Sequence, residues 1–126
     1  MSSSILVVDD EPQVSHFLKR VLKDACYVVS AAENGRQALA RIQAENFDLI
    51  LLDILMPDMD GLEFLRELLR AKLKPKVVAI SGQLFWLRAA KQLGARAILP
   101  KPISAEVLLQ VVSETLIDEE PNGSTD

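Results

Sequence analysis

The sequence predicts a doubly wound α/β fold: a three-layer sandwich in which a five-stranded parallel sheet lies between two layers of helices, five in all. Short apolar runs rich in Val, Ile and Leu alternate with longer segments whose apolar residues recur at helical spacing, and we count five of each. Most of these runs lack polar alternation, so both faces of each strand must be covered, as in a parallel sheet. At 126 residues the chain is long enough for one domain with a single hydrophobic core.

The five apolar runs define the predicted strands. They are ILVV at 5–8, YVVSA at 27–31, DLILL at 48–52, VVAI at 77–80 and AIL at 97–99. Crossovers between parallel strands are right-handed, so each intervening helix should fold back onto the sheet. The carboxyl ends of all five strands then meet at one edge, where ligands bind in sheets of this class.

Apolar stripes at helical spacing predict one helix after each strand. The stripes are Val14, Phe17, Leu18, Val21 and Leu22; Ala38, Leu39 and Ile42 after Asn34-Gly35; Leu62, Leu65 and Leu69; Trp86, Ala89, Ala90 and Leu93; and Leu108, Val111, Val112 and Leu116. Ser104 is a suitable N-cap for the last helix, because its hydroxyl can accept a hydrogen bond from an amide of the first turn.

Composition and charge exclude several classes of protein. A net charge of -4 without a block of Lys or Arg argues against nucleic acid as a direct ligand. No apolar run approaches the ~18 residues of a membrane span, and the opening residues MSSS lack the features of a secretion signal, so we expect a cytoplasmic protein without a membrane contact. The one cysteine, Cys26, cannot form an internal disulfide and is expected to be a small buried apolar residue.

The chain is predicted to contain one domain, at residues 1–117. Residues 118–126 are acidic, rich in turn formers and without apolar periodicity, which predicts a disordered tail or the start of a linker. Whether the domain stands alone or was cut from a longer protein stays open at this point.

Polar side chains collect where the predicted strands end. The first strand is followed by Asp9 and Asp10, the third by Asp53 and the fourth by Ser81, and the fifth leads to Lys101. Adjacent carboxylates resist ionising together unless a cation lies among them. Carboxylate oxygens without a nearby His or Cys suit a hard cation, and a small open site favours Mg²⁺.

Asp53 has a second possible role at this edge of the sheet. A carboxylate can attack phosphorus and form an aspartyl phosphate, provided that cations and hydrogen-bond donors offset the charge on the transferring group. Mg²⁺, the Lys101 ammonium and the Ser81 hydroxyl are such groups. The strand ends therefore predict a magnesium-dependent phosphoacceptor.

Four motifs in this order resemble the receiver domain of two-component response regulators. They are VVDDE at 7–11, LLDILMPDMDG at 51–61, AISG at 79–82, and KP at 101–102 after LGA at 93–95. The resemblance covers residues 5–117; each motif alone is weak, but the ordered set at domain spacing is specific. It implies a flavodoxin-like sheet with strand order 2-1-3-4-5 and a cis peptide bond between Lys101 and Pro102.

The resemblance also implies roles for the site residues. Asp53 would accept the phosphoryl group from a phosphohistidine on a sensor histidine kinase or a histidine phosphotransfer protein. Asp10, Asp53 and the main-chain carbonyl of Leu55 would bind Mg²⁺, and Asp9 would act through a bound water. The hydroxyl and ammonium groups at the fourth and fifth strand ends would hold phosphoryl oxygens.

One departure from the family concerns switching. Receivers usually carry Tyr or Phe three residues before the lysine, as a ring that turns inward on activation, whereas this chain has Ile98. The segment QLFWLRAAKQL at 83–93 holds more apolar residues than one stripe can bury, so Leu84 or Leu87 should be exposed. We expect a switch and partner face for an unknown downstream target, and a possible homodimer through the fourth helix. Its residues would be Leu84, Leu87, Ile98 and Pro102.

Other functions compete with this interpretation. A phosphatase with an aspartyl nucleophile generally needs a second Asp two positions later, where this chain has Leu55. A flavin binder would want a hydroxyl-rich phosphate loop after the first strand, where DDEP would repel phosphate. A degenerate receiver that signals by protein contacts without phosphorylation stays open as the alternative. We interpret the chain as a signalling module, which catalyses only its own phosphorylation and dephosphorylation, and not as an enzyme.

Overall fold

The computed structural model describes residues 2–56 and 59–118, and these residues form five strands and five helices in strict alternation. Every predicted element is present, with strand boundaries within one residue of the prediction. The strands are β1 (Ser4–Val8), β2 (Val28–Ala32), β3 (Leu49–Asp53), β4 (Val77–Ser81) and β5 (Ala97–Pro100). The helices are α1 (Pro12–Asp24), α2 (Gly35–Ala44), α3 (Gly61–Arg70), α4 (Leu84–Gln92) and α5 (Ala105–Ile117).

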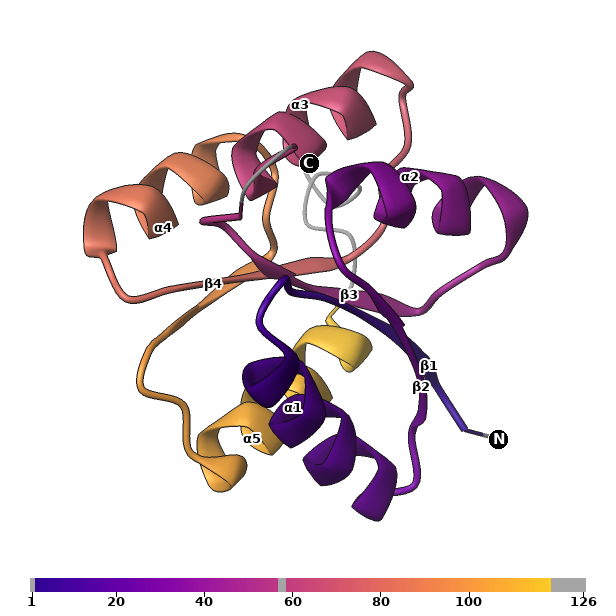
Figure 1. Cartoon of the computed structure of the whole chain (residues 1–126), viewed down its shortest axis with the longest axis vertical. Coiled ribbons are helices and arrows are strands. Elements are labelled where there is room, and N and C mark those ends of the chain that lie inside the picture. The colour runs from indigo at the N-terminus through magenta and orange to yellow at the C-terminus, as the bar shows by residue number, and fades with distance from the viewer. Residues whose placement is uncertain (1, 57–58, 119–126) are drawn as a thin grey trace.

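The strands form one parallel sheet in the order β2-β1-β3-β4-β5, which confirms both the fold class and the strand order. Helices α2, α3 and α4 cover one face of the sheet, and α1 and α5 cover the other (Figure 1). The described residues are therefore arranged as a three-layer sandwich, in which the carboxyl ends of all strands point to the same edge.

The two faces of the sheet support separate hydrophobic clusters. Phe64 of α3 is fully buried in the cluster under α2, α3 and α4, and Leu18 of α1 and Leu108 of α5 are fully buried in the cluster on the other face. Strands β3 and β4 are buried along their whole length because helices cover both of their sides. This burial explains why their sequences are apolar up to the last residue, which is Asp53 in β3 and Ser81 in β4.

Local caps and one close backbone contact position α3 next to the end of β3. Asp60 caps the helix, since its carboxylate accepts a hydrogen bond of 2.9 Å from the Glu63 amide. A side chain at Gly61 would place its Cβ 2.7 Å from the Ile54 Cα and 2.9 Å from the Asp53 carbonyl oxygen. Only glycine permits this approach, so the first turn of α3 lies directly against the end of β3.

Two predicted burial positions are wrong in addition to Phe17 of α1, which is 39% exposed. Leu69 was expected on the inward stripe of α3 but is 54% exposed, whereas Leu68 is 4% exposed and occupies the inward position. Cys26 was expected to be buried but is exposed, in a left-handed conformation with φ 72° in the turn that ends α1. Its amide donates to the Lys23 carbonyl at 2.9 Å, so backbone geometry at a helix end places this residue at the surface.

The carboxyl end of the described chain lies at Asp118. Its carboxylate is 3.4 Å from the Arg96 guanidinium. Residues 119–126, which make up most of the predicted tail, lie outside the described residues. Within the described ranges no helix has the length and apolar character needed to cross a membrane.

Neighbouring leucines of α3 provide a test of the inward face. Leu68→Ala should lower the free energy of unfolding by about 3 kcal/mol, because it leaves a cavity under the helix. Leu69→Ala should lower it by less than about 1 kcal/mol, because that side chain is already largely in water. Urea denaturation followed by circular dichroism measures both, and equal losses would contradict the assigned orientation of α3.

Candidate functional site

The predicted site residues meet at the carboxyl edge of the sheet. Asp53 and Ser81 are the last residues of β3 and β4, and Asp9 and Lys101 directly follow β1 and β5. The parallel register aligns these strand ends. A hydrogen bond of 3.0 Å from the Lys101 amide to the Ser81 carbonyl continues the alignment past β5. The side chains therefore start from adjacent positions on a rigid support.

Burial makes this edge electrostatically unusual. Among the described residues, the buried polar or charged side chains are Asp9, Asp53, Ser81 and Thr115, and three of these four belong to the site. Both aspartates are only 3% exposed. Loss of hydration raises the pKa of Asp9, and the same effect together with the charge of Asp9 raises the pKa of Asp53 to about 6.

The aspartates are only partly compensated by hydrogen bonds and charges. The Glu11 amide donates to Asp9 Oδ1 at 2.8 Å, but Asp9 Oδ2 is buried without a hydrogen-bond partner among the described residues. The Lys101 ammonium lies 3.8 Å from Asp53 Oδ1 and 3.8 Å from a Glu11 carboxylate oxygen. A buried carboxylate oxygen without a partner is costly, which indicates a place for a ligand.

The donor set suits a divalent cation. Asp9, Asp10 and Asp53 each offer one carboxylate oxygen, and these atoms all lie within 4.8 Å of one another. Asp10 is only partly buried, so one side of the cluster is accessible from outside. Three carboxylate oxygens and no nitrogen or sulfur donor in the group match the preference of Mg²⁺ for hard oxygen ligands. The residues present therefore fit the metal that the sequence predicts.

Ser81 and Leu55 border the carboxylates through different groups. The Gln83 amide donates to Ser81 Oγ at 3.1 Å, which leaves the hydroxyl proton of Ser81 available to another acceptor. Leu55 lies two residues beyond β3 with an exposed side chain, and a backbone hydrogen bond at Leu55 opposes the rise in the pKa of Asp53. Leu55 thus contacts Asp53 through its main chain, and binding of Mg²⁺ by its carbonyl stays a prediction.

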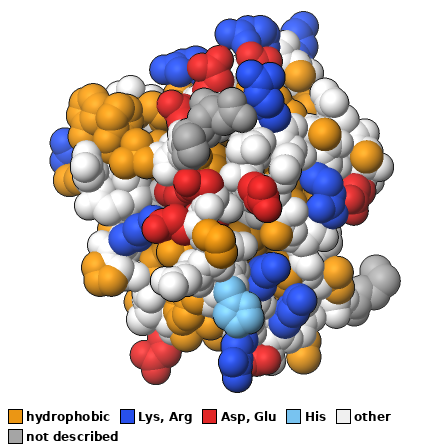
Figure 2. All heavy atoms as spheres, in the orientation of Figure 1, with side chains coloured by type: hydrophobic (Ala, Val, Ile, Leu, Met, Phe, Trp, Pro, Cys, Tyr) orange, Lys and Arg blue, Asp and Glu red, His pale blue; other side chains and the backbone are white. Residues whose placement is uncertain are grey.

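The exposed surface of α4 differs from the prediction. Leu84 is 56% exposed as expected, but Leu87 is 1% exposed, and Phe85 is the most exposed residue of the three at 70%. The buried residues of α4 are Leu87 and Ala90, so this side of the helix faces the sheet. Phe85 lies about two hundred degrees around the helix axis from Leu87. Leu84 and Phe85, here called the α4 patch, form part of the apolar surface that Figure 2 shows over α4.

The other two members of the predicted partner face lie elsewhere. Ile98 is half-buried on β5 and packs against the cluster under α2, α3 and α4. Pro102 follows Lys101 through a cis peptide bond, as the resemblance implied, and is exposed. It lines a hollow of about 510 Å³, here called the α1 hollow, between α1 and the connection from β5 to α5. The residues that line the α1 hollow are Gln13, Val14, Phe17, Lys101, Pro102 and Ile103.

Sequence reasoning missed several residues at these surfaces. Glu11 was given no role at the site, yet its carboxylate lies 3.8 Å from the Lys101 ammonium. Its position as the third acid of DDE was the available signal. Phe17 was assigned to the inward stripe of α1 but is 39% exposed at the α1 hollow, and Phe85 was not singled out at all.

The comparisons with known proteins agree with this geometry. The model of the response regulator receiver domain family matches residues 5–113. The chain is 34% identical to the chemotaxis protein CheY of Bacillus subtilis over 92% of this chain and 99% of that protein, and 31% identical to sporulation initiation phosphotransferase F of the same organism over 92% and 95%. The solved structure of the chemotaxis protein CheY4 of Vibrio cholerae superposes with a TM-score of 0.84 at 30% identity, over 91% of this chain and 99% of that one. The chain therefore belongs to the response regulator receiver domain family, the phosphoacceptor modules of two-component signalling systems.

Proposed function

We propose that Asp53 accepts a phosphoryl group from a phosphohistidine in a reaction that requires Mg²⁺, and that the acyl phosphate changes the contacts made by the surface of the domain. The observation that carries this proposal is the buried carboxylate cluster with Lys101 3.8 Å from Asp53. It combines a nucleophile, a cation site and an ammonium at one edge of the sheet, which is the set of groups that phosphoryl transfer to a carboxylate needs.

Each side chain of the site has one role in the proposed phosphoryl transfer. A carboxylate oxygen of Asp53 attacks phosphorus, the phosphorus–nitrogen bond to the donor imidazole breaks, and that nitrogen keeps the electron pair and takes a proton. With its pKa near 6, Asp53 is mostly ionised at neutral pH and can act as the nucleophile. The Lys101 ammonium and the free hydroxyl proton of Ser81 are donors for the phosphoryl oxygens.

The metal would be held by the groups predicted from the sequence. Asp10, Asp53 and the carbonyl of Leu55 would bind it directly, and Asp9 would bind through a water. Bound there, Mg²⁺ would offset the charge of the carboxylates and of the incoming phosphoryl oxygens. The orphaned oxygen of Asp9 supports this assignment, because a metal-bound water would give it the hydrogen-bond partner that the described residues do not provide.

The phosphodonor is proposed to dock on the α1 hollow. This hollow has apolar walls that include Phe17 and Ile103, and it reaches Lys101 at the edge of the site. A donor helix seated there could present its phosphohistidine to Asp53 while its apolar side chains contact the hollow. A sensor histidine kinase or a histidine phosphotransfer protein is the expected partner.

The α4 patch is proposed as the contact for a downstream target or a second copy of the chain. Leu84 and Phe85 are too exposed to serve the core, and the Phe85 ring rests edge-on against Trp86, with centroids 5.0 Å apart. Ile98 of β5 packs under the same helix, so a shift of β5 would displace α4. Phe85 thereby replaces Leu87 in the proposed partner face.

The proposal describes a signalling module of residues 1–117 that works in the cytoplasm. It is not an enzyme for a separate metabolite, because Leu55 occupies the position where an aspartyl phosphatase would need a proton donor. A receiver that signals without phosphate would have no use for an intact acceptor, lysine and hydroxyl arranged in this way.

Modification of Asp53 is tested by intact-protein mass spectrometry with acetyl phosphate as donor. The wild-type chain should gain one phosphoryl group in the presence of Mg²⁺ and none in the presence of a chelator. Asp53→Asn should remove the adduct, and Asp24→Asn, at an exposed position on α1, should leave it unchanged. An adduct that survives in Asp53→Asn would exclude Asp53 as the acceptor.

The raised pKa of Asp53 predicts how stability depends on pH. Because the folded chain binds this proton more tightly than the unfolded chain, its contribution to stability is complete below about pH 4 and is lost as pH rises through about 6. In metal-free buffer Asp53→Asn should therefore raise the free energy of unfolding by about 2 kcal/mol at neutral pH and by little near pH 4. Urea denaturation at both pH values measures this difference, and Mg²⁺ should stabilise the wild-type chain more than the variant. A neutral-pH loss of stability in Asp53→Asn would contradict the assigned electrostatics.

One substitution in each of the two partner surfaces distinguishes their roles. Phe17→Asp should slow phosphoryl transfer from a histidine phosphotransfer protein by at least about tenfold, without slowing transfer from acetyl phosphate, because a small donor does not use the α1 hollow. Phe85→Glu should leave both rates unchanged and should reduce self-association or target binding after phosphorylation, measured by sedimentation velocity and by pull-down. If Phe17→Asp slows both donors equally, the hollow is not a docking surface.

A further inference from the structure

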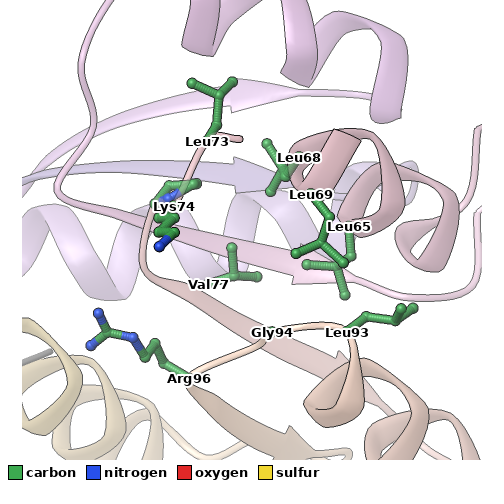
Figure 3. Close-up of a pocket in the computed structure, with 10 residues that line it drawn as sticks. Leu65, Leu68, Leu69, Leu73, Lys74, Val77, Leu93, Gly94 and Arg96 are labelled. Atoms are coloured by element: carbon green, nitrogen blue, oxygen red, sulfur yellow. The ribbon is translucent and has the colours of Figure 1, made fainter. Parts of the chain in front are cut away.

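A cavity of about 200 Å³ lies at the opposite edge of the sheet from Asp53. Leu65, Leu68 and Val77 are buried and form its floor, and the exposed side chain of Leu69 stands at its rim (Figure 3). The end of α4 closes the other side. The cavity is therefore an apolar opening between α3 and α4 that the helices of this chain do not fill.

The segment that forms one side of this cavity is rich in basic residues. The segment RELLRAKLKPK at 66–76 carries five of the chain's fourteen Lys and Arg residues and one acid, in a protein whose net charge is -4. Arg66, Arg70, Lys72 and Lys74 are all exposed, although Arg70 pairs with Glu67. Figure 2 shows Lys and Arg side chains near α3 at the top of the view, with acidic side chains among them. Positive charge at this density attracts acidic ligands.

One residue of the cavity lining already pairs with a carboxylate of this chain. Arg96 lies on its wall, and the guanidinium of Arg96 contacts the Asp118 carboxylate at 3.4 Å. The Lys91 ammonium donates to the Arg96 carbonyl at 2.7 Å, which holds this part of the wall in place. Lys74 also lines the opening, and its exposed ammonium is the cation of the lining that can bind a carboxylate of a ligand.

We propose that this cationic cavity binds an acidic peptide segment of another protein, with one bulky apolar side chain of the peptide inserted between α3 and α4. The leucine floor provides burial for that side chain, and the rim provides charge for its acidic neighbours. The volume accommodates a single large side chain and not a folded element. A purely apolar partner would gain nothing from the surrounding cations, and a polyanion without apolar groups would leave the floor uncovered.

This surface goes beyond the phosphoryl-transfer function and is separate from it. The cavity lies at the amino ends of β4 and β5, while Asp53 lies at the carboxyl end of β3. Binding should therefore not require phosphorylation, in contrast to binding at the α4 patch. The cavity would give the receiver a constant attachment to an acidic partner while its opposite edge is phosphorylated.

Fluorescence anisotropy with two labelled peptides tests the proposal on the full chain. One twelve-residue peptide carries Asp and Glu around a central Phe, and its match carries Ser in place of Phe. The Phe peptide should bind at least about tenfold more tightly, and added salt should weaken its binding. Lys74→Glu should weaken binding of the Phe peptide at least about tenfold. Leu69→Ser should reduce the difference in affinity between the two peptides. Both positions are exposed, so the variants should fold, which circular dichroism checks.

Arg20→Glu, at an exposed position on α1, is the matched control and should bind like the wild-type chain. Equal binding of the two peptides, equal weakening by Arg20→Glu and Lys74→Glu, or no binding at millimolar peptide would each overturn the proposal. Binding to phosphatidylglycerol vesicles that Lys74→Glu abolishes, without peptide binding, would assign the surface to a membrane and overturn it as well. The Asp53→Asn variant should bind the Phe peptide with the affinity of the wild-type chain. The peptide-binding proposal and the phosphoryl-transfer proposal can therefore be refuted separately.

Discussion

The desolvation of two aspartates is the physical constraint around which this protein is organised. Asp9 and Asp53 are held almost without water at the carboxyl edge of the sheet, and burial raises the pKa of both. Lys101 at 3.8 Å from Asp53 and one backbone hydrogen bond to Asp9 offset only part of this cost. The same repulsion that disfavours ionisation in the folded chain favours the binding of a divalent cation, and it leaves a nucleophilic oxygen in a poorly hydrated environment.

The sheet prevents the aspartates from moving apart to relieve this repulsion. Strands β3 and β4 are buried along their whole length, and Gly61 brings the first turn of α3 against the end of β3. The surfaces where contacts with other proteins are proposed lie away from this rigid edge or only touch its border. The α1 hollow reaches Lys101, the α4 patch lies over the neighbouring helix, and the cationic cavity lies at the far ends of the strands. One small domain thus has room for a donor, a target and a constant partner at different places.

Several burial positions could not be predicted, because they depend on how a helix is rotated against the sheet or on the backbone conformation where the helix ends. The pattern of α3 allows Leu68 or Leu69 to face inward, and the contact at its first turn decides for Leu68. On α4 the apolar run is continuous, so periodicity cannot separate Leu87 from Phe85; packing against β4 and β5 buries Leu87. Cys26 is exposed because the turn after α1 needs a left-handed residue there, a requirement that its apolar character does not reveal.

The sequence by itself determined the α/β class, the five strands and the residues at their ends, because continuous apolar runs and β-α alternation are local patterns, whereas the strand order was implied by the resemblance to receiver domains. Motifs at the strand ends identified the site, since parallel strands bring their carboxyl ends to one edge wherever the chain places them. Only the tertiary structure decided which carboxylate oxygen lacks a partner, that Glu11 reaches Lys101, and which apolar side chains border the surface hollows. These properties arise from contacts between segments distant in sequence, and local periodicity carries no information about the rotation and spacing of the elements that make them.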